Sequence, residues 1–239
     1  MSKLAIHGGN PVRTKPFPEW PRPTSELKDA IISTLENEGW GVGSKAISRF
    51  EERFADFHDA KFCISTSSGT TALWVALKAA GVKAGDEVIV PPYTFIATAS
   101  AVLMANAVPI FVDIDEKTLN IDPELIEAAI TEKTKAIMPV QLNGRTCNMD
   151  SINEIANKHN LLIIEDSAQG LGSLYKGKMA GTFGLAGTYS FYPAKVLGCF
   201  GDGGAVITND DAIAEKVKLL RDHGRDDNGE FQTWGFNSR

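Results

Sequence analysis

Short apolar runs alternate along the chain with stretches in which apolar residues recur every three or four positions. Runs such as LLIIED carry neighbouring apolar residues, as strands do when both faces of their sheet are covered. The three-to-four spacing between these runs is typical of amphipathic helices. The alternation predicts an α/β fold, a three-layer α/β/α sandwich around a mostly parallel mixed sheet.

The same pattern gives the bounds of the expected elements. The predicted helices cover residues 24–38, 47–57, 70–80, 96–105, 123–130, 149–159 and 211–223. The predicted strands cover residues 61–66, 88–90, 108–112, 136–140, 161–165, 187–191 and 204–208. In the first helix, Leu27, Ile31 and Leu35 share one face.

Glycine and proline are frequent before the first helix, so residues 1–23 are expected to form an extended arm. Residues 24–239 show no repeat, low-complexity stretch or linker. They are expected to form one large domain.

Composition and charge narrow the class of protein. The chain has 239 residues, of which 43% are hydrophobic, enough for a globular core. A net charge of −6 argues against a nucleic-acid-binding surface. The most apolar window, 88–112, is interrupted by prolines and polar residues, and the N-terminus lacks a signal-peptide core. Three scattered cysteines and histidines without ligand spacing favour a cytoplasmic protein with free thiols and no metal site.

The segment SSGTT opens the helix predicted at 70–80. Amides at a helix start have no partner within the helix, and the hydroxyls of Ser68 and Thr70 lie beside them. Gly69 would let a phosphate approach the backbone. The segment therefore predicts a phosphate site, with ordinary helix capping as the competing explanation.

Two further segments follow strands and carry charged groups. In EDSAQ, Asp166 stays ionised only beside a cation or hydrogen-bond donors, and a protonated pyridine nitrogen would serve; capping of the next turn is the alternative. In SFYPAK, apolar and small neighbours favour a nucleophilic amine on Lys195, and Ser190 adds a hydroxyl for a phosphate. A surface lysine is the plainer interpretation.

The segment PPYTF offers Tyr93 and Phe95, on which a flat heteroaromatic ring could stack, although core packing is the commoner use of such residues. Each of the four signals is weak when taken singly. Together they form the set that pyridoxal phosphate (PLP) needs: a phosphate cradle, a partner for the pyridine nitrogen, a Schiff-base lysine and a stacking face. The sequence therefore predicts a PLP-binding protein with Lys195 as the attachment point.

The motifs SGTTAL, PPYTFIATAS, EDSAQ, SFYPAK and GFNSR resemble those of the DegT/StrS-type sugar aminotransferases, which are fold-type I PLP enzymes. The resemblance covers nearly the whole chain, and EDxxQ followed by SFxxxK is its specific part. It implies transfer of an amino group from glutamate or glutamine to a keto-sugar, nucleotide-linked in many relatives, or to a cyclitol ketone.

The resemblance also implies roles for single residues. Lys195 corresponds to the lysine that forms the Schiff base and moves the proton. Asp166 corresponds to the partner of the pyridine nitrogen, and Gln169 to an amide beside the 3-hydroxyl. Phe95, rather than Tyr93, corresponds to the stacking aromatic. The positions beside the phosphate are Ser68, Gly69, Thr70 and Ser190.

The end of the chain and one internal position carry further implications of the resemblance. Asn237 corresponds to an asparagine that reaches the phosphate in the neighbouring subunit, which implies a homodimer with shared active sites. Gln141 stands where many members carry histidine, so the role of that position is open. The chain stops at Arg239, whereas the family continues into a smaller C-terminal domain, which implies a truncated chain.

Other functions stay open. Related sugar dehydratases carry histidine in place of the lysine, and Lys195 argues against that reaction. A regulatory or degenerate paralogue that binds PLP would fit a truncated chain. Residues 41–46 match G-x-G-x-x-A of nicotinamide-binding proteins, but they follow a helix instead of a strand.

Overall fold

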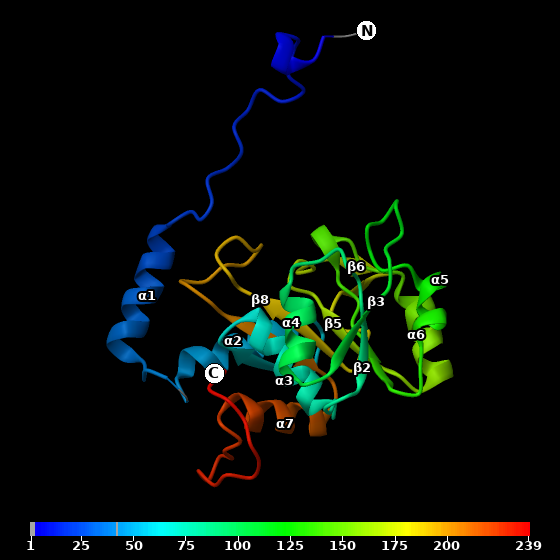
Figure 1. Cartoon of the computed structure of the whole chain (residues 1–239). Coiled ribbons are helices and arrows are strands. Elements are labelled where there is room, and N and C mark those ends of the chain that lie inside the picture. The colour runs from blue at the N-terminus through cyan, green and yellow to red at the C-terminus, as the bar shows by residue number, and fades with distance from the viewer. Residues whose placement is uncertain (1–2, 42) are drawn as a thin grey trace.

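A seven-stranded mixed sheet forms the centre of the molecule in the computed structural model, which describes residues 3–41 and 43–239 (Figure 1). The strand order is β1-β9-β8-β5-β4-β2-β3, and β9 runs antiparallel to both of its neighbours. The pairs β2–β3, β2–β4, β4–β5 and β5–β8 are parallel. The strands are β1 Phe62–Thr66, β2 Glu87–Val90, β3 Val108–Phe111, β4 Thr134–Ile137, β5 Leu162–Asp166, β8 Ala186–Ser190 and β9 Gly204–Thr208.

Helices cover both faces of this sheet. The helices are α1 Ser25–Asn37, α2 Lys45–Phe57, α3 Gly69–Ala79, α4 Ala97–Met104, α5 Pro123–Ile126, α6 Met149–His159 and α7 Asp211–Arg221. One face packs against α3, α4 and α7, and the other against α2, α5 and α6. The predicted three-layer α/β/α sandwich is therefore confirmed.

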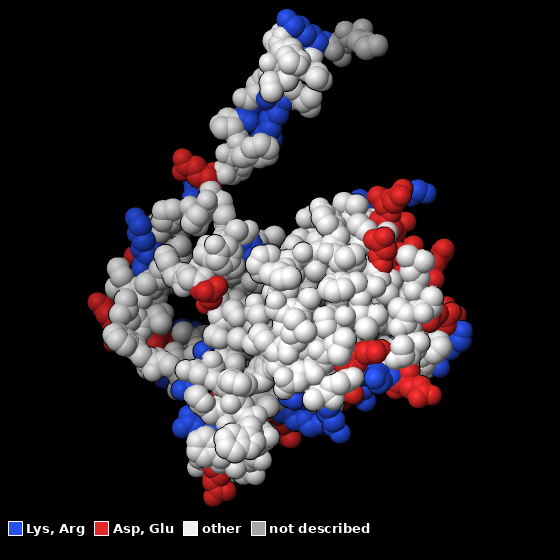
Figure 2. Space-filling model, viewed as in Figure 1, with Lys and Arg blue, Asp and Glu red and all other residues white. Residues whose placement is uncertain are grey.

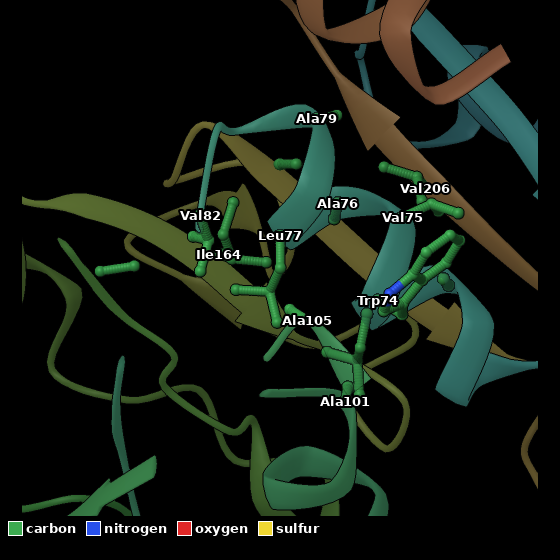
Figure 3. Close-up of a cluster of buried hydrophobic side chains, with 14 of the residues drawn as sticks. Trp74, Val75, Ala76, Leu77, Ala79, Val82, Ala101, Ala105, Ile164 and Val206 are labelled. Atoms are coloured by element: carbon green, nitrogen blue, oxygen red, sulfur yellow. The ribbon is translucent and has the colours of Figure 1, made fainter. Parts of the chain in front are cut away.

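The core on the α3 side explains why the chain folds this way (Figure 3). Trp74, Val75 and Leu77 of α3 meet Ile164 of β5 and Val206 of β9, and all are fully or almost fully buried. Burial of one such side chain stabilises the fold by roughly 1.5–3 kcal/mol. Alternate residues of each strand face the other layer, where Ile163 joins the cluster formed with α6.

The predicted elements agree with the structure except in detail. The helix expected at 123–130 is the short α5, continued by a 3₁₀ turn at Glu127–Ala129, and the strand expected at 136–140 ends at Ile137. The helix expected at 211–223 ends at Arg221. A hairpin of β6 (Leu174–Tyr175) and β7 (Lys178–Met179) and 3₁₀ turns at Ala5–His7 and Leu142–Gly144 were not predicted. Their short lengths leave little periodic signal.

The N-terminal segment extends from the sandwich, which it contacts through Trp20. Figure 1 shows residues 3–23 running away from the body and α1 lying beside it. The helix itself was predicted, but its apolar face is not buried, since Leu27 is 42% and Leu35 55% exposed. Val42, within the glycine-rich hexad 41–46, lies outside the described residues.

Two global expectations concern cysteines and membranes. Cys63, Cys147 and Cys199 are free thiols, the first two buried and the third exposed. None of the helices in the described part of the chain has the length and apolar character needed to span a bilayer.

Candidate active site

The start of α3 lies at the edge of the sheet where β1 ends. The Ser68 hydroxyl accepts a hydrogen bond from the Thr71 amide (3.1 Å), and Thr71 Oγ1 accepts one from the Ser68 amide (3.0 Å). The capping interpretation is therefore correct for the Ser68 side chain. The amides of Gly69 and Thr70 belong to the first turn, where helix geometry leaves N–H groups free for an anion.

Close backbone approach joins this helix start to β8 and β9. A Cβ atom added at Gly69 would lie 2.6 Å from Cβ and 3.1 Å from Oγ of Ser190. One added at Gly204 would lie 2.4 Å from the carbonyl oxygen of Ser68. Two glycines thus let the hydroxyl of Ser190, at the end of β8, lie beside the amides that open α3.

Asp166 ends β5, which β9 and β8 separate from β1 in the sheet. Its side chain is on the α4 face, where Thr98 donates to Oδ2 (2.7 Å) and the Ala168 amide donates to Oδ1 (3.2 Å). Burial raises the pKa of Asp166, while the hydrogen bonds from Thr98 and Ala168 and the charge of Lys195 act in the opposite direction. A buried carboxylate beside a lysine is suited to hold one further cationic donor.

Glu165, the neighbouring carboxylate, points to the opposite face and is already saturated. Its Oε1 accepts from the amides of Phe183 (2.6 Å) and Gly184 (2.9 Å). Its Oε2 accepts from the Gly181 amide (2.7 Å) and from Gln141 Nε2 (2.7 Å). Burial raises the pKa of Glu165, and these donors oppose that effect. Of the two adjacent acids, Asp166 is therefore the one with acceptor capacity left for a ligand.

Gln141 hydrogen-bonds to Glu165, on the face of the sheet opposite Asp166. Its side chain is fully buried: Nε2 donates to Glu165, and Oε1 accepts from the Cys147 amide (2.7 Å). A neutral histidine in its place could also donate one N–H to Glu165. Glutamine at position 141 and histidine can therefore both donate a hydrogen bond to Glu165.

Lys195 lies in the loop that follows β8. Its amide donates to the Tyr192 carbonyl (2.8 Å), which forms a tight turn, and its side chain is half-buried. Trp20 of the N-terminal segment donates from Nε1 to the Pro193 carbonyl (2.8 Å). The charge of Lys195 acts on Asp166 and opposes the rise that burial causes in the pKa of that carboxyl, so Lys195 lies within electrostatic reach of it.

Gln169 and Phe95 lie in the loops that flank this edge. Gln169 is half-buried, and its Oε1 accepts from the Asn143 amide (2.8 Å), which leaves its NH₂ group as a donor. Phe95 lies two residues before the start of α4 and three before Thr98, and it is 66% exposed. Its exposure excludes the core-packing interpretation of this aromatic.

Asn237 lies in the C-terminal segment that follows α7. The backbone of Asn237 bridges Asp222, and the carbonyl of Ser238 accepts from the Ser67 amide (2.7 Å). The exposed side chain lines a cavity of about 1050 Å³ beside the C-terminal end of α7, with Arg225. No hydrogen bond between described residues joins Asn237 to the residues around Asp166.

Sequence reasoning missed the residues that support the acids. Thr98 was not singled out, although it is a polar position in the otherwise small and apolar stretch ATASAVLM of α4. Glu165 was noted only as part of a motif, and its pairing with Gln141 depends on residues 24 positions apart. The alternation of strand residues could have shown that Glu165 and Asp166 face opposite layers.

A sequence model of the DegT/DnrJ/EryC1/StrS aminotransferase family matches residues 22–239. The chain belongs to this family. Aminotransferases of this family depend on PLP.

Named relatives show what the chain is similar to. It is 45% identical over 230 residues to L-glutamine:2-deoxy-scyllo-inosose aminotransferase of Streptomyces kanamyceticus, covering 94% of this chain and 54% of that protein. It is 46% identical over 211 residues to UDP-2-acetamido-2-deoxy-3-oxo-D-glucuronate aminotransferase of Pseudomonas aeruginosa, covering 88% of this chain and 59% of that protein. The chain thus spans little more than half the length of these relatives.

A solved structure has the same fold. The crystal structure of S. venezuelae DesV in complex with a ketimine intermediate superposes with a TM-score of 0.87 at 41% identity. The match covers 90% of this chain and 57% of that one.

Proposed function

We propose that this chain binds PLP through Lys195 and belongs to an aminotransferase that acts on keto-sugars or keto-cyclitols. The observation that carries the proposal is the buried carboxylate of Asp166, which has spare acceptor capacity and lies within the electrostatic reach of Lys195. Its neighbour Glu165 has no such capacity, because four donors saturate it.

The residues present fit the cofactor. The first-turn amides of Gly69 and Thr70, with the hydroxyl of Ser190 beside them, suit a phosphate. Gly69 has no side chain, which is what allows Ser190 to lie against the start of α3. The exposed ring of Phe95 is available for stacking, and the free NH₂ of Gln169 can donate to a phenolic oxygen.

Bound there, PLP would supply an electron sink that stabilises negative charge on a substrate carbon. Asp166 would hold the proton of the ring nitrogen and so maintain that capacity. Lys195 would hold the cofactor, and its amine would move a proton at the substrate carbon.

The substrate classes come from the relatives. One relative is named for glutamine as amino donor and a keto-cyclitol as acceptor, and another for a UDP-linked keto-sugar. We propose glutamate or glutamine as the donor here, and a keto-sugar, nucleotide-linked, or a keto-cyclitol as the acceptor.

The assembly is a homodimer in this proposal, with Asn237 completing the site of the neighbouring subunit. Its side chain is exposed and lines the cavity beside the C-terminal end of α7, where another chain could reach it. Figure 2 shows a broad face over α4 with few charged side chains. The apolar residues exposed on that part of the chain include Phe95, Ile96, Leu103, Met104, Val108 and Phe111. Such a face is typical of a protein interface.

Residues 24–239 are proposed to form the PLP-binding large domain, preceded by the arm at 1–23. The three free cysteines support a reducing compartment, and we propose a cytoplasmic location.

Borohydride reduction of the PLP-treated chain, followed by peptide mass spectrometry, tests the attachment. The cofactor mass is expected on the peptide that contains Lys195. Lys195→Ala should lose both this adduct and the visible absorbance of the lysine-bound cofactor. Lys216→Ala, an exposed lysine on α7, is the matched control and should retain both. An adduct on another lysine, or an unchanged spectrum in Lys195→Ala, would show that the assignment is wrong.

Amino-transfer assays separate the proposed reaction from its alternatives. Conversion of a keto-sugar or keto-cyclitol in the presence of glutamine supports the aminotransferase. Covalent PLP binding without turnover of any such acceptor would favour a regulatory or degenerate paralogue.

A further inference from the structure

Thr98 occupies the second position of α4 and is completely buried. Its Oγ1 lies 2.7 Å from Asp166 Oδ2 and 2.8 Å from Thr94 Oγ1. A hydroxyl has one proton to donate, and an ionised carboxylate can only accept. With Asp166 ionised, Thr98 therefore donates to Asp166 and accepts from Thr94, which gives a chain of two hydrogen bonds that points at the carboxylate.

Packing alone does not explain a threonine at this position. Valine has nearly the same volume and would bury no hydroxyl, whereas a buried hydroxyl is costly unless it is hydrogen-bonded. The other residues of α4 that face the core are small or apolar, such as Ala101 and Val102. What the hydroxyl of Thr98 adds is its bond to Asp166.

We propose that Thr98 is a positioning residue for the cofactor site, which sets the orientation of Asp166 toward a ring-nitrogen proton and is itself held by Thr94. This inference rests on the proposed function. Ala168 holds Oδ1 through its amide (3.2 Å), while Thr98 holds Oδ2. Two donors on different oxygens define the plane of the carboxylate and leave the remaining acceptor directions open.

The charged groups around Asp166 make this support necessary. Lys195, in the loop after β8, is the cation whose charge acts on Asp166. In the proposed function the amine of Lys195 binds the cofactor, so its charge would not always be available to Asp166. Glu165, the adjacent acid, lies on the other face and is satisfied by its own donors. A hydrogen bond from Thr98 keeps stabilising the charged form of Asp166 whatever the state of Lys195.

The first test needs no cofactor. The carboxyl carbon of Asp166, assigned through the Asp166→Asn variant, is titrated by ¹³C NMR in the parent chain and in Thr98→Val. The hydrogen bond to a charged acceptor predicts that Thr98→Val raises the titration midpoint by about one pH unit or more. Thr98→Ser, which keeps the hydroxyl, should titrate close to the parent. Identical midpoints for the parent and Thr98→Val would overturn the inference.

Circular dichroism would reveal whether the buried valine of Thr98→Val impairs folding. Thr94→Val is a second variant for that case. It removes the bond that supports Thr98 and leaves the donor to Asp166 in place. A smaller shift in the same direction is expected, and no shift in a folded Thr94→Val chain would contradict the two-bond arrangement.

A PLP titration of the same variants, followed by absorbance, separates this inference from the proposed function. The affinity of Thr98→Val is expected to fall about tenfold, which corresponds to one pH unit on the Asp166 midpoint. Equal binding by the parent and Thr98→Val would refute the positioning role alone. Absence of binding by the parent chain would refute the proposed function and the positioning role with it.

Discussion

The side-chain amide of Gln141 donates to Glu165 Oε2 over 2.7 Å, and both side chains are closed to solvent. The same amide accepts from the Cys147 backbone through its oxygen. Gln141→Leu would leave one carboxylate oxygen short of a donor and one buried N–H without an acceptor. We expect a loss of about 2–4 kcal/mol in the free energy of unfolding, measured by urea denaturation.

Gln141→His supplies the control for this prediction. A neutral imidazole can still donate to Glu165, so the loss of stability should be smaller than for leucine. Equal losses for histidine and leucine would show that volume, and not the donor, is what the position requires.

Gly69 has no room for a side chain, because its Cβ would lie 2.6 Å from that of Ser190. Gly69→Ala should push the start of α3 away from β8, with a loss of about 1–3 kcal/mol of stability and weaker phosphate binding. The double variant Gly69→Ala, Ser190→Gly removes the atoms in conflict and should recover most of the stability. Gly39→Ala, where the added Cβ meets nothing within 4 Å, is the control for thermal melting.

His58 predicts a pH dependence of stability. Its ring is buried between Phe54 and Tyr189, with Nδ1 2.8 Å from the Phe54 carbonyl oxygen, and burial lowers its pKa. Below about pH 6.5 the unfolded chain therefore binds a proton at His58 that the folded chain does not. The stability that the neutral, buried His58 contributes is complete above about pH 6.5 and is lost as the pH falls towards the folded pKa.

The comparison with His58→Gln isolates this effect, because the carboxylates are common to both chains. The free energy of unfolding of the parent should decline more steeply than that of the variant between pH 6.5 and 5, by at most about 1.4 kcal/mol per pH unit. Parallel curves across that range would show that His58 does not titrate on unfolding.

Arg221 links three elements through one guanidinium. It contacts Glu51 of α2 (2.5 Å) and the Ser65 carbonyl of β1 (2.8 Å), and both charged side chains are less than one-fifth exposed. Arg221→Leu should lower the free energy of unfolding by about 2 kcal/mol, between the values for surface and buried pairs. A double-mutant cycle with Glu51→Gln measures the coupling, and additive losses would contradict a direct ion pair.

Local pattern was sufficient for most of the fold. The spacing of apolar residues predicted the strands and the longer helices, because burial on one or both faces leaves a period of two, a period of 3.6 or a continuous run. For Leu27 and Leu35 the same pattern predicted the helix correctly, yet this helix has an apolar side and no buried residue. Periodicity reports which face of an element is apolar, and it does not report what covers that face.

The motifs located most of the candidate site for a related reason. Asp166 and Ser190 end their strands and Ser68 follows one, and the ends of parallel strands meet at one edge of a sheet. Chain order alone therefore placed these residues together.

Only the tertiary structure decided which side chains hydrogen-bond to these site residues. Pairings across tens of residues, such as Thr98 with Asp166 and Gln141 with Glu165, depend on side-chain direction and helix packing to within an ångström. Local conformational preferences do not encode such distances, because the distances result from how the helix layers pack against the sheet. Lys195 and Asp166 could be named from the sequence, whereas the choice of Asp166 over Glu165 on physical grounds required their different surroundings in the folded chain.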